Sequence, residues 1–514
     1  IHGWLGDYAK ALECLQRALV EAEGLGAKDL IVGDQCLIAT TQLARGDAAA
    51  SAAAARRAAT LLGSLATGLA EEQGAQARER FEGIFDVGAR AALRLDDPAE
   101  LVFFLESGRA ATLREALGAR DALHAATVPE ELRAEEAEAR TREALAARRH
   151  AEALGRGERH SREELDAAQA KAADVVARIQ RHAKAGNVVY PEADSLEAMR
   201  GRVQEGEALV LYALLSDEAV ALVLTRGAER IVRLGKSEAI EAASADLERL
   251  GKLVVEPLGL DKETTRVLVS PAGALAYVPF ALLLEDREVV YVPSGTTYGV
   301  LLDEAAKRGE GVLALGDPDY GRVAATALTV LRGGAGLPPL PGTREEAKTV
   351  GDVVLLGADA TEAGLLGAVA KRPRWRAVHL ACHGLVDPGR PLLSSLALSG
   401  GDFLATIEVF RAKVPADLVV LSACETAKGK VYEAEGVVGF VRAFMFAGAP
   451  RVLVSLWKVD DEATRALMVK FYELWKGGKA CATALREAQR FVAAQKKWKD
   501  PKYWAAWQLW GLPD

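Results

Sequence analysis

The sequence has few cysteines and no long uninterrupted apolar run. It contains 5 cysteines in 514 residues, too few for a disulfide framework, and their odd number leaves at least one free thiol, as expected in a reducing cytoplasm. The longest apolar stretches, residues 209–224 and 437–457, are each interrupted by charged residues, so we expect no bilayer span and no membrane partner. The chain begins at Ile1 without an initiator methionine or a signal-peptide pattern; secretion is unsupported, and we expect more residues upstream.

Neither sign of charge dominates. Lysine and arginine number 64 against 72 aspartates and glutamates, a formal net charge of −8, which excludes the overall basic character typical of nucleic-acid-binding proteins. Hydrophobic residues make up 50% and charged residues 26%, which excludes a mainly disordered or collagen-like chain. At roughly 100–200 residues per domain, the length predicts about three or four folding units.

Turn signals recur near the start of the chain. Gly6-Asp7-Tyr8 and Gly46-Asp47-Ala48 lie 40 residues apart, and each precedes small and apolar residues at helical spacing. A looser third copy begins at Asp96-Asp97, a further 50 residues along, which requires an insertion around residues 68–76. Small residues let helices approach closely, so the pattern predicts stacked helix pairs; an irregular helical bundle is the alternative. Residues 1–125 resemble tetratricopeptide repeats, which implies a concave surface for a regulatory protein or peptide.

Composition changes twice in the middle of the chain. Residues 126–186 are dense in alanine, glutamate and arginine, which predicts a charged helical connector. Residues 187–310 contain strand patterns. Within them we expect a hairpin at residues 208–215 and 219–225 and further strands at residues 267–269 and 276–278.

Short β-branched runs alternate with helical stretches in residues 311–514. The alternation predicts a mainly parallel sheet with helices on both faces, and the expected strands are residues 312–315, 353–356, 377–380, 418–421 and 452–456. A helix is expected at residues 435–447, and the tryptophans of residues 498–510 are interpreted as docking a last helix on the sheet. In open sheets of this class chemistry collects at the carboxyl ends of the strands.

Two of these strands end in residues capable of nucleophilic catalysis. His383 follows one strand and Cys424 follows the next, so parallel pairing would bring an imidazole near a thiol. A thiolate is a nucleophile, and a nearby imidazole can deprotonate the thiol and later protonate a leaving amine. Gly384 could bring a backbone N–H close to an oxyanion. The pattern makes His383 and Cys424 a candidate catalytic dyad, with buried structural residues as the alternative.

Other chemistries fit these residues less well. His379, Cys382 and His383 are potential metal ligands, but side chains alternate along a strand, so one ion could not reach all three. A serine hydrolase would need a Gly-x-Ser-x-Gly turn, which the sequence lacks. The other cysteines lie in helical contexts, and we expect them to be small core residues: Cys14, Cys36 and Cys481.

Several segments together resemble the CHAT family, caspase-like peptidase domains associated with tetratricopeptide repeats. The resemblance covers residues 190–514 and depends on His383-Gly384, residues 421–426 (LSACET) and residues 455–461 (SLWKVDD), in that order. It implies an α/β caspase-like fold and a cysteine endopeptidase with His383 and Cys424 as the dyad. By the same resemblance the N–H groups of Gly384 and Cys424 stabilise the oxyanion, and no metal or organic cofactor is required.

The resemblance also suggests where specificity arises. Residues 457–461 are similar to a loop that lines the pocket for the residue before the scissile bond in separase-like relatives. Asp461, then Asp460, are the candidates to bind an arginine or lysine there, with Trp457 as a neighbouring wall. Either aspartate could instead cap the helix that follows. More distant acidic candidates are Asp387, Asp402 and Glu425.

Two functions remain open from the sequence. The first is a cytoplasmic cysteine endopeptidase that cleaves a protein substrate under control of a partner on the repeat array, with a bacterial defence or cell-death pathway as its expected setting. The second is a catalytically silent interaction scaffold. Residues 337–341, LPPLP, are expected to form a surface linker that could serve as a self-cleavage or substrate-access loop.

Overall fold

The structure is a computed structural model that describes most of the chain in two compact units. The described residues are 7–65, 83–116, 130–155, 161–182, 193–303, 308–320, 337–385, 394–422, 434–457 and 459–514. Unit 1 comprises residues 1–199 with 229–231, and unit 2 comprises residues 200–228 and 232–514. The four domain ranges expected from the sequence stay predictions. Among the described residues, no helix combines the length and the apolar character that a bilayer crossing requires.

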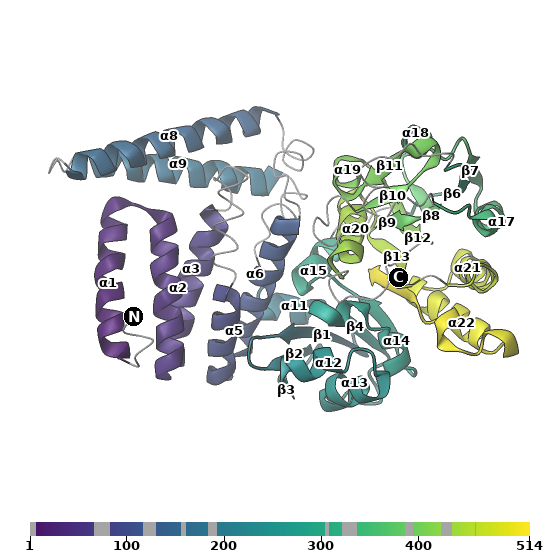
Figure 1. The fold of residues 1–514 in the computed structure, drawn as a ribbon, viewed down its shortest axis with the longest axis horizontal. Coiled ribbons are helices and arrows are strands. Elements are labelled where there is room, and N and C mark those ends of the chain that lie inside the picture. The colour runs from purple at the N-terminus through teal and green to yellow at the C-terminus, as the bar shows by residue number, and fades with distance from the viewer. Residues whose placement is uncertain are drawn as a thin grey trace. The chain divides into compact units, whose positions relative to one another are not determined.

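Unit 1 begins with an array of helices that pack against their neighbours in the chain. These are α1 (Tyr8–Leu25), α2 (Lys28–Arg45), α3 (Ala48–Leu65), α5 (Gly83–Leu95) and α6 (Pro98–Ala116), drawn in purple and blue in Figure 1. Small side chains lie at the contacts, as predicted: Ser51 and Ala55 of α3 are fully buried, and the Ser51 hydroxyl donates to the Ala39 carbonyl of α2 at 2.8 Å. The predicted insertion lies outside the described residues.

The recurring turn signal has a physical basis in helix capping. Gly46 ends α2 with a left-handed φ of +94°, a conformation that costs glycine little. The next residue, Asp47, begins α3 by accepting the Ala50 N–H at 3.1 Å. The third copy repeats the geometry, because Asp96 has a φ of +52° and Asp97 accepts the Glu100 N–H at 3.0 Å. The helix-pair prediction is therefore confirmed.

The charged connector is a pair of long helices, α8 (Glu130–Gly155) and α9 (Ser161–His182). They lie side by side, and α1 contacts α8 (Figure 1). Buried His150 of α8 binds the Gly24 carbonyl of α1 through Nε2 at 2.7 Å. The two helices thus form part of unit 1.

Unit 2 is organised around one sheet, in which the described residues form 11 strands in the order β3-β2-β1-β4-β5-β14-β13-β12-β8-β6-β7. Antiparallel pairs are β1 with β2 and β13 with β14, whereas the pairs from β12 to β7 are parallel. The strands are β1 (Glu207–Leu214), β2 (Ala219–Leu224), β3 (Glu229–Gly235), β4 (Arg266–Ser270), β5 (Glu288–Tyr291), β6 (Val312–Pro318), β7 (Val353–Gly357), β8 (Trp375–Ala381), β12 (Ala416–Leu421), β13 (Arg451–Ser455) and β14 (Trp507–Gly511). A small sheet contains β9 (Gly384–Leu385), β10 (Ser395–Ala397) and β11 (Phe403–Ala405).

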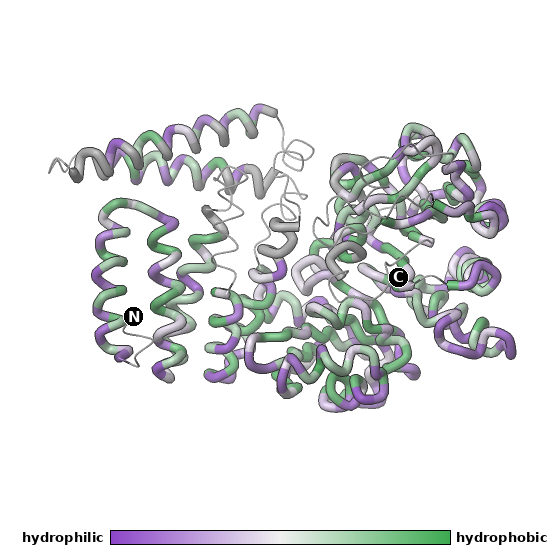
Figure 2. Tube along the Cα trace, in the orientation of Figure 1, coloured by the Kyte–Doolittle hydropathy of each residue, from purple (hydrophilic) through white to green (hydrophobic). Residues whose placement is uncertain are grey.

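Helices cover both faces of the sheet, as predicted. Figure 1 shows α17 (Pro341–Val350), α21 (Asp461–Lys476) and α22 (Cys481–Ala493) on one side. On the other side lie α18 (Glu362–Val369), α19 (Thr406–Arg411) and α20 (Ala434–Phe446). Figure 2 shows hydrophobic stretches along the strands and hydrophilic residues on the surrounding helices. The remaining helices of this region are α11 (Leu196–Arg202), α12 (Ser237–Ala242), α13 (Leu247–Val254), α14 (Phe280–Leu283) and α15 (Gly295–Asp303).

Most of the predicted strands are confirmed, but two sequence interpretations are wrong. Residues 276–278 do not form a strand, because Gly273–Tyr277 is a turn of 3₁₀ helix (η3) that buries Leu275. The last tryptophans do not all belong to a helix that packs on the sheet. Trp507 and Trp510 lie in β14, which pairs with β13 and β5 in the middle of the sheet and is buried along its whole length. A strand buried on both faces has no polar alternation to reveal it.

The end of β14 provides a test of this packing. Gly511 has a φ of +98°, and a Cβ there would lie 2.1 Å from the Pro450 carbonyl oxygen. Gly478, after α21, has the same φ but nothing within 4 Å. We expect Gly478→Ala to lower the free energy of unfolding by about 1–2 kcal/mol, the cost of left-handed backbone. Gly511→Ala should lower it by roughly 3 kcal/mol or more, because the clash adds to that cost. Denaturant unfolding followed by tryptophan fluorescence measures both, and equal losses would contradict the close approach.

Candidate active site

The two strands expected to carry the dyad are neighbours. β8 and β12 pair in parallel, with Leu380 opposite Leu421, and the Ser422 N–H donates to the Leu380 carbonyl at 2.9 Å. His383 lies two residues beyond the end of β8. Cys424 lies outside the described residues, two positions after Ser422. The pairing and direction of the strands are confirmed, and both strand ends meet at one edge of the sheet.

His383 is held firmly beneath the surface. It is 2% exposed, and its ring lies against the Tyr320 ring with the centroids 5.1 Å apart. Its backbone N–H donates to the Tyr320 hydroxyl at 3.1 Å, and its carbonyl accepts the Ala397 N–H at 2.8 Å. Tyr320 and Ala397 belong to a small apolar cluster with Leu385, against which Leu337 and Leu340 pack. The packing restricts how the imidazole can turn.

The imidazole also has a defined hydrogen-bond partner. Its Nε2 lies 2.8 Å from the carbonyl oxygen of Pro338. A carbonyl oxygen only accepts hydrogen bonds, so Nε2 carries the hydrogen in this contact. In a neutral ring the lone pair is then at Nδ1. The expected surface linker thus reaches the candidate catalytic histidine through its backbone.

The other predicted residues occupy distinct positions around this edge. Gly384 lies in β9 and pairs with Leu396 of β10. Asp460 is the N-cap of α21 and accepts the N–H groups of Glu462 and Ala463 at 3.1 and 3.0 Å. Trp457, after β13, donates from its indole to the Lys502 carbonyl at 2.9 Å.

Asp461 contacts the linker that reaches His383. It is the first residue of α21, and a Cβ added to Gly342 would lie 2.5 Å from an Asp461 carboxylate oxygen. Gly342 follows Pro338 by four positions, so one short segment contacts both His383 and Asp461. Among the more distant acidic candidates, Asp402 is exposed before β11, and the other two, Asp387 and Glu425, lie outside the described residues.

Sequence reasoning missed several polar residues beside the strand ends. Glu346 of α17 is 3% exposed and contacts both His379 and Ser422. Tyr320 and Pro338, the partners of His383, were also missed as site residues. Glu346 and Tyr320 lie among other polar residues in the sequence, so no local pattern marks either of them as buried. Among the described residues, no group of three or more His, Cys, Asp or Glu side chains could hold a metal ion.

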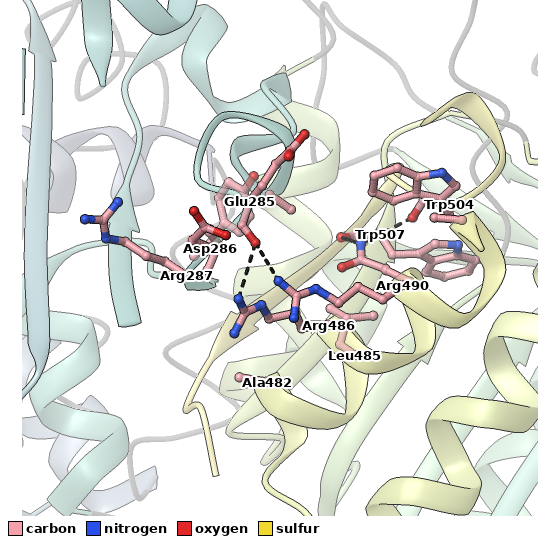
Figure 3. Close-up of a pocket in the computed structure, with 14 residues that line it drawn as sticks. Glu285, Asp286, Arg287, Ala482, Leu485, Arg486, Arg490, Trp504 and Trp507 are labelled. Atoms are coloured by element: carbon pink, nitrogen blue, oxygen red, sulfur yellow. Dashed lines mark hydrogen bonds between the residues drawn. The ribbon is translucent and has the colours of Figure 1, made fainter. Parts of the chain in front are cut away.

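A separate pocket, with a volume of about 300 Å³, lies between α22 and the residues that precede β5 (Figure 3). Arg486 and Arg490 both donate to the Glu285 carbonyl, at 3.3 and 3.0 Å, and Trp504 and Trp507 form another part of the lining. None of the residues predicted for catalysis lines this pocket. The candidate active site is therefore the strand edge.

Comparison with known proteins identifies the family. The CHAT domain model matches residues 244–512, more than half of the chain. The chain belongs to the CHAT domain family. Its membership, with the fold described above, confirms the expected caspase-like α/β domain preceded by a helical repeat array.

Two curated relatives are tetratricopeptide repeat proteins. Tetratricopeptide repeat protein 28 of Homo sapiens is 27% identical over 308 residues, and its counterpart of the same name in Mus musculus is 27% identical over 311 residues. Each alignment covers 50% of this CHAT protein, which spans only 12% of either relative.

Solved structures are more distant. The Saccharomyces cerevisiae separase–securin complex has a TM-score of 0.40 at 10% identity, covering 99% of this chain and 48% of that chain. The Arg-specific cysteine proteinase gingipain R has a TM-score of 0.32 at 10% identity, covering 52% of this chain and 67% of that chain. With TM-scores this low, individual residues of the CHAT protein cannot be matched to residues of these structures.

The described cysteines differ in burial. Cys14 is exposed, contrary to the expectation that it is a core residue, whereas Cys382 and Cys481 are fully buried. Burial raises the pKa of Cys36 and of Cys481 to about 12. Only the thiolate reacts with alkylating reagents.

We expect brief alkylation of the native protein at pH 8 to modify Cys14 and to spare Cys36 and Cys481. A thiol with a pKa of about 12 is ionised to only about one part in ten thousand at that pH, against about a quarter for an ordinary thiol. Mass spectrometry of tryptic peptides measures the modified fractions, with the urea-unfolded protein as control. Modification of Cys481 as fast as Cys14 would contradict the burial.

Proposed function

We propose that the protein is a cysteine endopeptidase in which Cys424 is the nucleophile and His383 the general base. The parallel pairing of β8 with β12 carries this proposal. The Ser422 N–H donates to the Leu380 carbonyl, which fixes the chain at this edge two positions before Cys424 in the sequence. His383 leaves the neighbouring strand at that edge.

The contacts of His383 support a defined proton path. With Nε2–H bonded to the Pro338 carbonyl, Nδ1 is the nitrogen that would take the thiol proton of Cys424. The thiolate attacks the peptide carbonyl, and the N–H groups of Gly384 and Cys424 stabilise the oxyanion. Protonated His383 then gives its proton to the departing amine, leaving a thioester that water hydrolyses. Every step uses groups of this chain, the substrate and water.

The second candidate function is an interaction scaffold without catalysis. His383 is 2% exposed and packs beneath residues 337–340, which favours a structural role unless that segment moves aside. The helical array gives either function a place for a regulatory protein or peptide. Leu30 and Leu37 of α2 are 50% and 54% exposed, and their spacing of seven residues puts them on one face.

Labelling by a peptide that carries a thiol-reactive electrophile separates the two functions. We expect Cys424 to be labelled in the wild type, and His383→Ala to slow its labelling at least tenfold because the base is lost. A Cys14→Ser background removes the exposed thiol that would otherwise react. Equal labelling rates with and without His383, or labelling of Cys382 instead of Cys424, would contradict the protease function and support the scaffold function.

The substrate can be sought directly with the same variants. New protein N-termini that appear in cells with the wild type, and that are missing with Cys424→Ala, mark cleaved proteins and give the residue before each cut. Their complete absence at equal expression would favour the scaffold.

Asp461 is the residue we propose to select an arginine or lysine before the scissile bond. This proposal is supported by residues 338–342, which contact both side chains. Pro338 contacts His383, and Gly342, four positions later, contacts Asp461. A carboxylate there would pair with a guanidinium through two hydrogen bonds.

We expect Asp461→Asn to lower kcat/KM for arginyl peptides by about tenfold or more, because losing one charged partner costs roughly 1.5–3 kcal/mol. Asp460→Asn is the matched control, since asparagine still caps α21 while the charge is removed. Fluorogenic peptides differing only in that residue measure the effect. Equal losses in the two variants would assign the effect to general electrostatics and contradict the role of Asp461.

A further inference from the structure

We propose that Glu346 is a positioning residue of the candidate active site. Its buried carboxylate joins β8, through His379, to β12, through Ser422, and so holds together the two strand ends that lead to His383 and Cys424. This inference rests on the proposed function, but its physical basis can be tested without substrate.

The contacts converge on one oxygen. Oε1 of Glu346 lies 3.0 Å from His379 Nε2 and 2.6 Å from the Ser422 hydroxyl oxygen. The three side chains are 3%, 0% and 7% exposed, respectively, so water hardly competes for these bonds. Two donors on one oxygen suit an ionised carboxylate, which has lone pairs for both.

A fourth residue, Tyr472, extends this hydrogen-bond network to α21. The Tyr472 hydroxyl of α21 lies 3.3 Å from His379 Nδ1. If Tyr472 donates to Nδ1, the His379 ring has its hydrogen on Nε2, the nitrogen that faces Glu346. Burial, and then the charge of Glu346, raise the pKa of Tyr472, which keeps its hydroxyl protonated to donate. In this arrangement Tyr472 donates to His379, and both His379 and Ser422 donate to Glu346.

The position of these residues along the chain links them to catalysis. His379 precedes His383 by four residues, and Ser422 precedes Cys424 by two. Glu346 lies on α17, which begins three residues after Pro338, the partner of His383. The carboxylate therefore connects the segments that carry the nucleophile, the base and the group that orients the base.

Stability alone does not explain a carboxylate at this place. A buried charge loses its hydration, and apolar side chains of similar volume often stabilise a core as well or better. The carboxylate instead orients its neighbours, because it accepts hydrogen bonds only when the His379 ring and the Ser422 hydroxyl point toward it. The backbone ladder already sets the register of β8 and β12, and Glu346 adds a side-chain tie at the end of that ladder.

The test compares three substitutions in the full chain. Ser422→Ala removes one donor with little change in volume, Glu346→Gln keeps the shape but not the charge, and Glu345→Gln is the control on the exposed face of the same helix. Two measurements are made: hydrogen exchange of the β12 amides up to Ser422, and the rate at which iodoacetamide alkylates Cys424, with Cys14 as internal reference.

We expect Ser422→Ala and Glu346→Gln to speed exchange of the Ser422 amide at least tenfold and to slow Cys424 alkylation at least fivefold, with Glu345→Gln unchanged. Cys382 and Cys481 should stay unmodified, which separates a local effect from general unfolding. Ser422→Thr, which restores a hydroxyl, should recover most of the alkylation rate.

Three results would overturn the proposal: unchanged exchange and alkylation in both variants, general modification of the buried cysteines with no selective loss at Cys424, or a threonine variant no better than alanine. Failure of the proposed function looks different. In that case Cys424 alkylation is insensitive to His383→Ala in the wild-type background, while exchange of the Ser422 amide still reports whether Glu346 holds the strands.

Discussion

The parallel ladder between β8 and β12 is the constraint on which the candidate site depends. Both strands end at the same edge of the sheet, so His383, after β8, and Ser422, after β12, follow adjacent strand ends. A parallel pair needs a long crossover, and the residues between these strands supply it with the small sheet and α19. That crossover also places Ala397 beside His383, whereas Tyr320, which packs on the imidazole, comes from the residues after β6.

The segment before α17 links several of these parts. Its Pro338 carbonyl holds Nε2 of His383, and its Gly342 permits the close approach of Asp461 from the start of α21. The helix that follows supplies Glu346 to the ends of β8 and β12. Residues 338–346 therefore contact the histidine, the candidate specificity residue and the ends of both strands.

The sheet also explains why the CHAT domain match includes residues 507–511. β14, the last strand, pairs with β13 on one side and β5 on the other, and so joins the half that contains β1 to the half that carries the candidate site. Trp510 of β14 stacks on Tyr291 of β5 with ring centroids 5.2 Å apart. Without β14 the two halves would each expose an unpaired strand edge.

Features that depend on interactions over a few residues could be predicted from the amino-acid sequence. The glycine and aspartate at each repeat turn set helix ends through local capping, the β-branched runs predicted the strands, and the ends of two runs marked His383 and Cys424. Tertiary structure decided the rest. The carbonyl that meets His383 comes from 45 residues away, and Glu346 reaches Ser422 across 76 residues. Asp460 and Asp461 are adjacent, yet one caps its helix and the other packs on Gly342. A buried polar group takes whichever partner packing brings to it, and that choice leaves no periodic pattern in the chain.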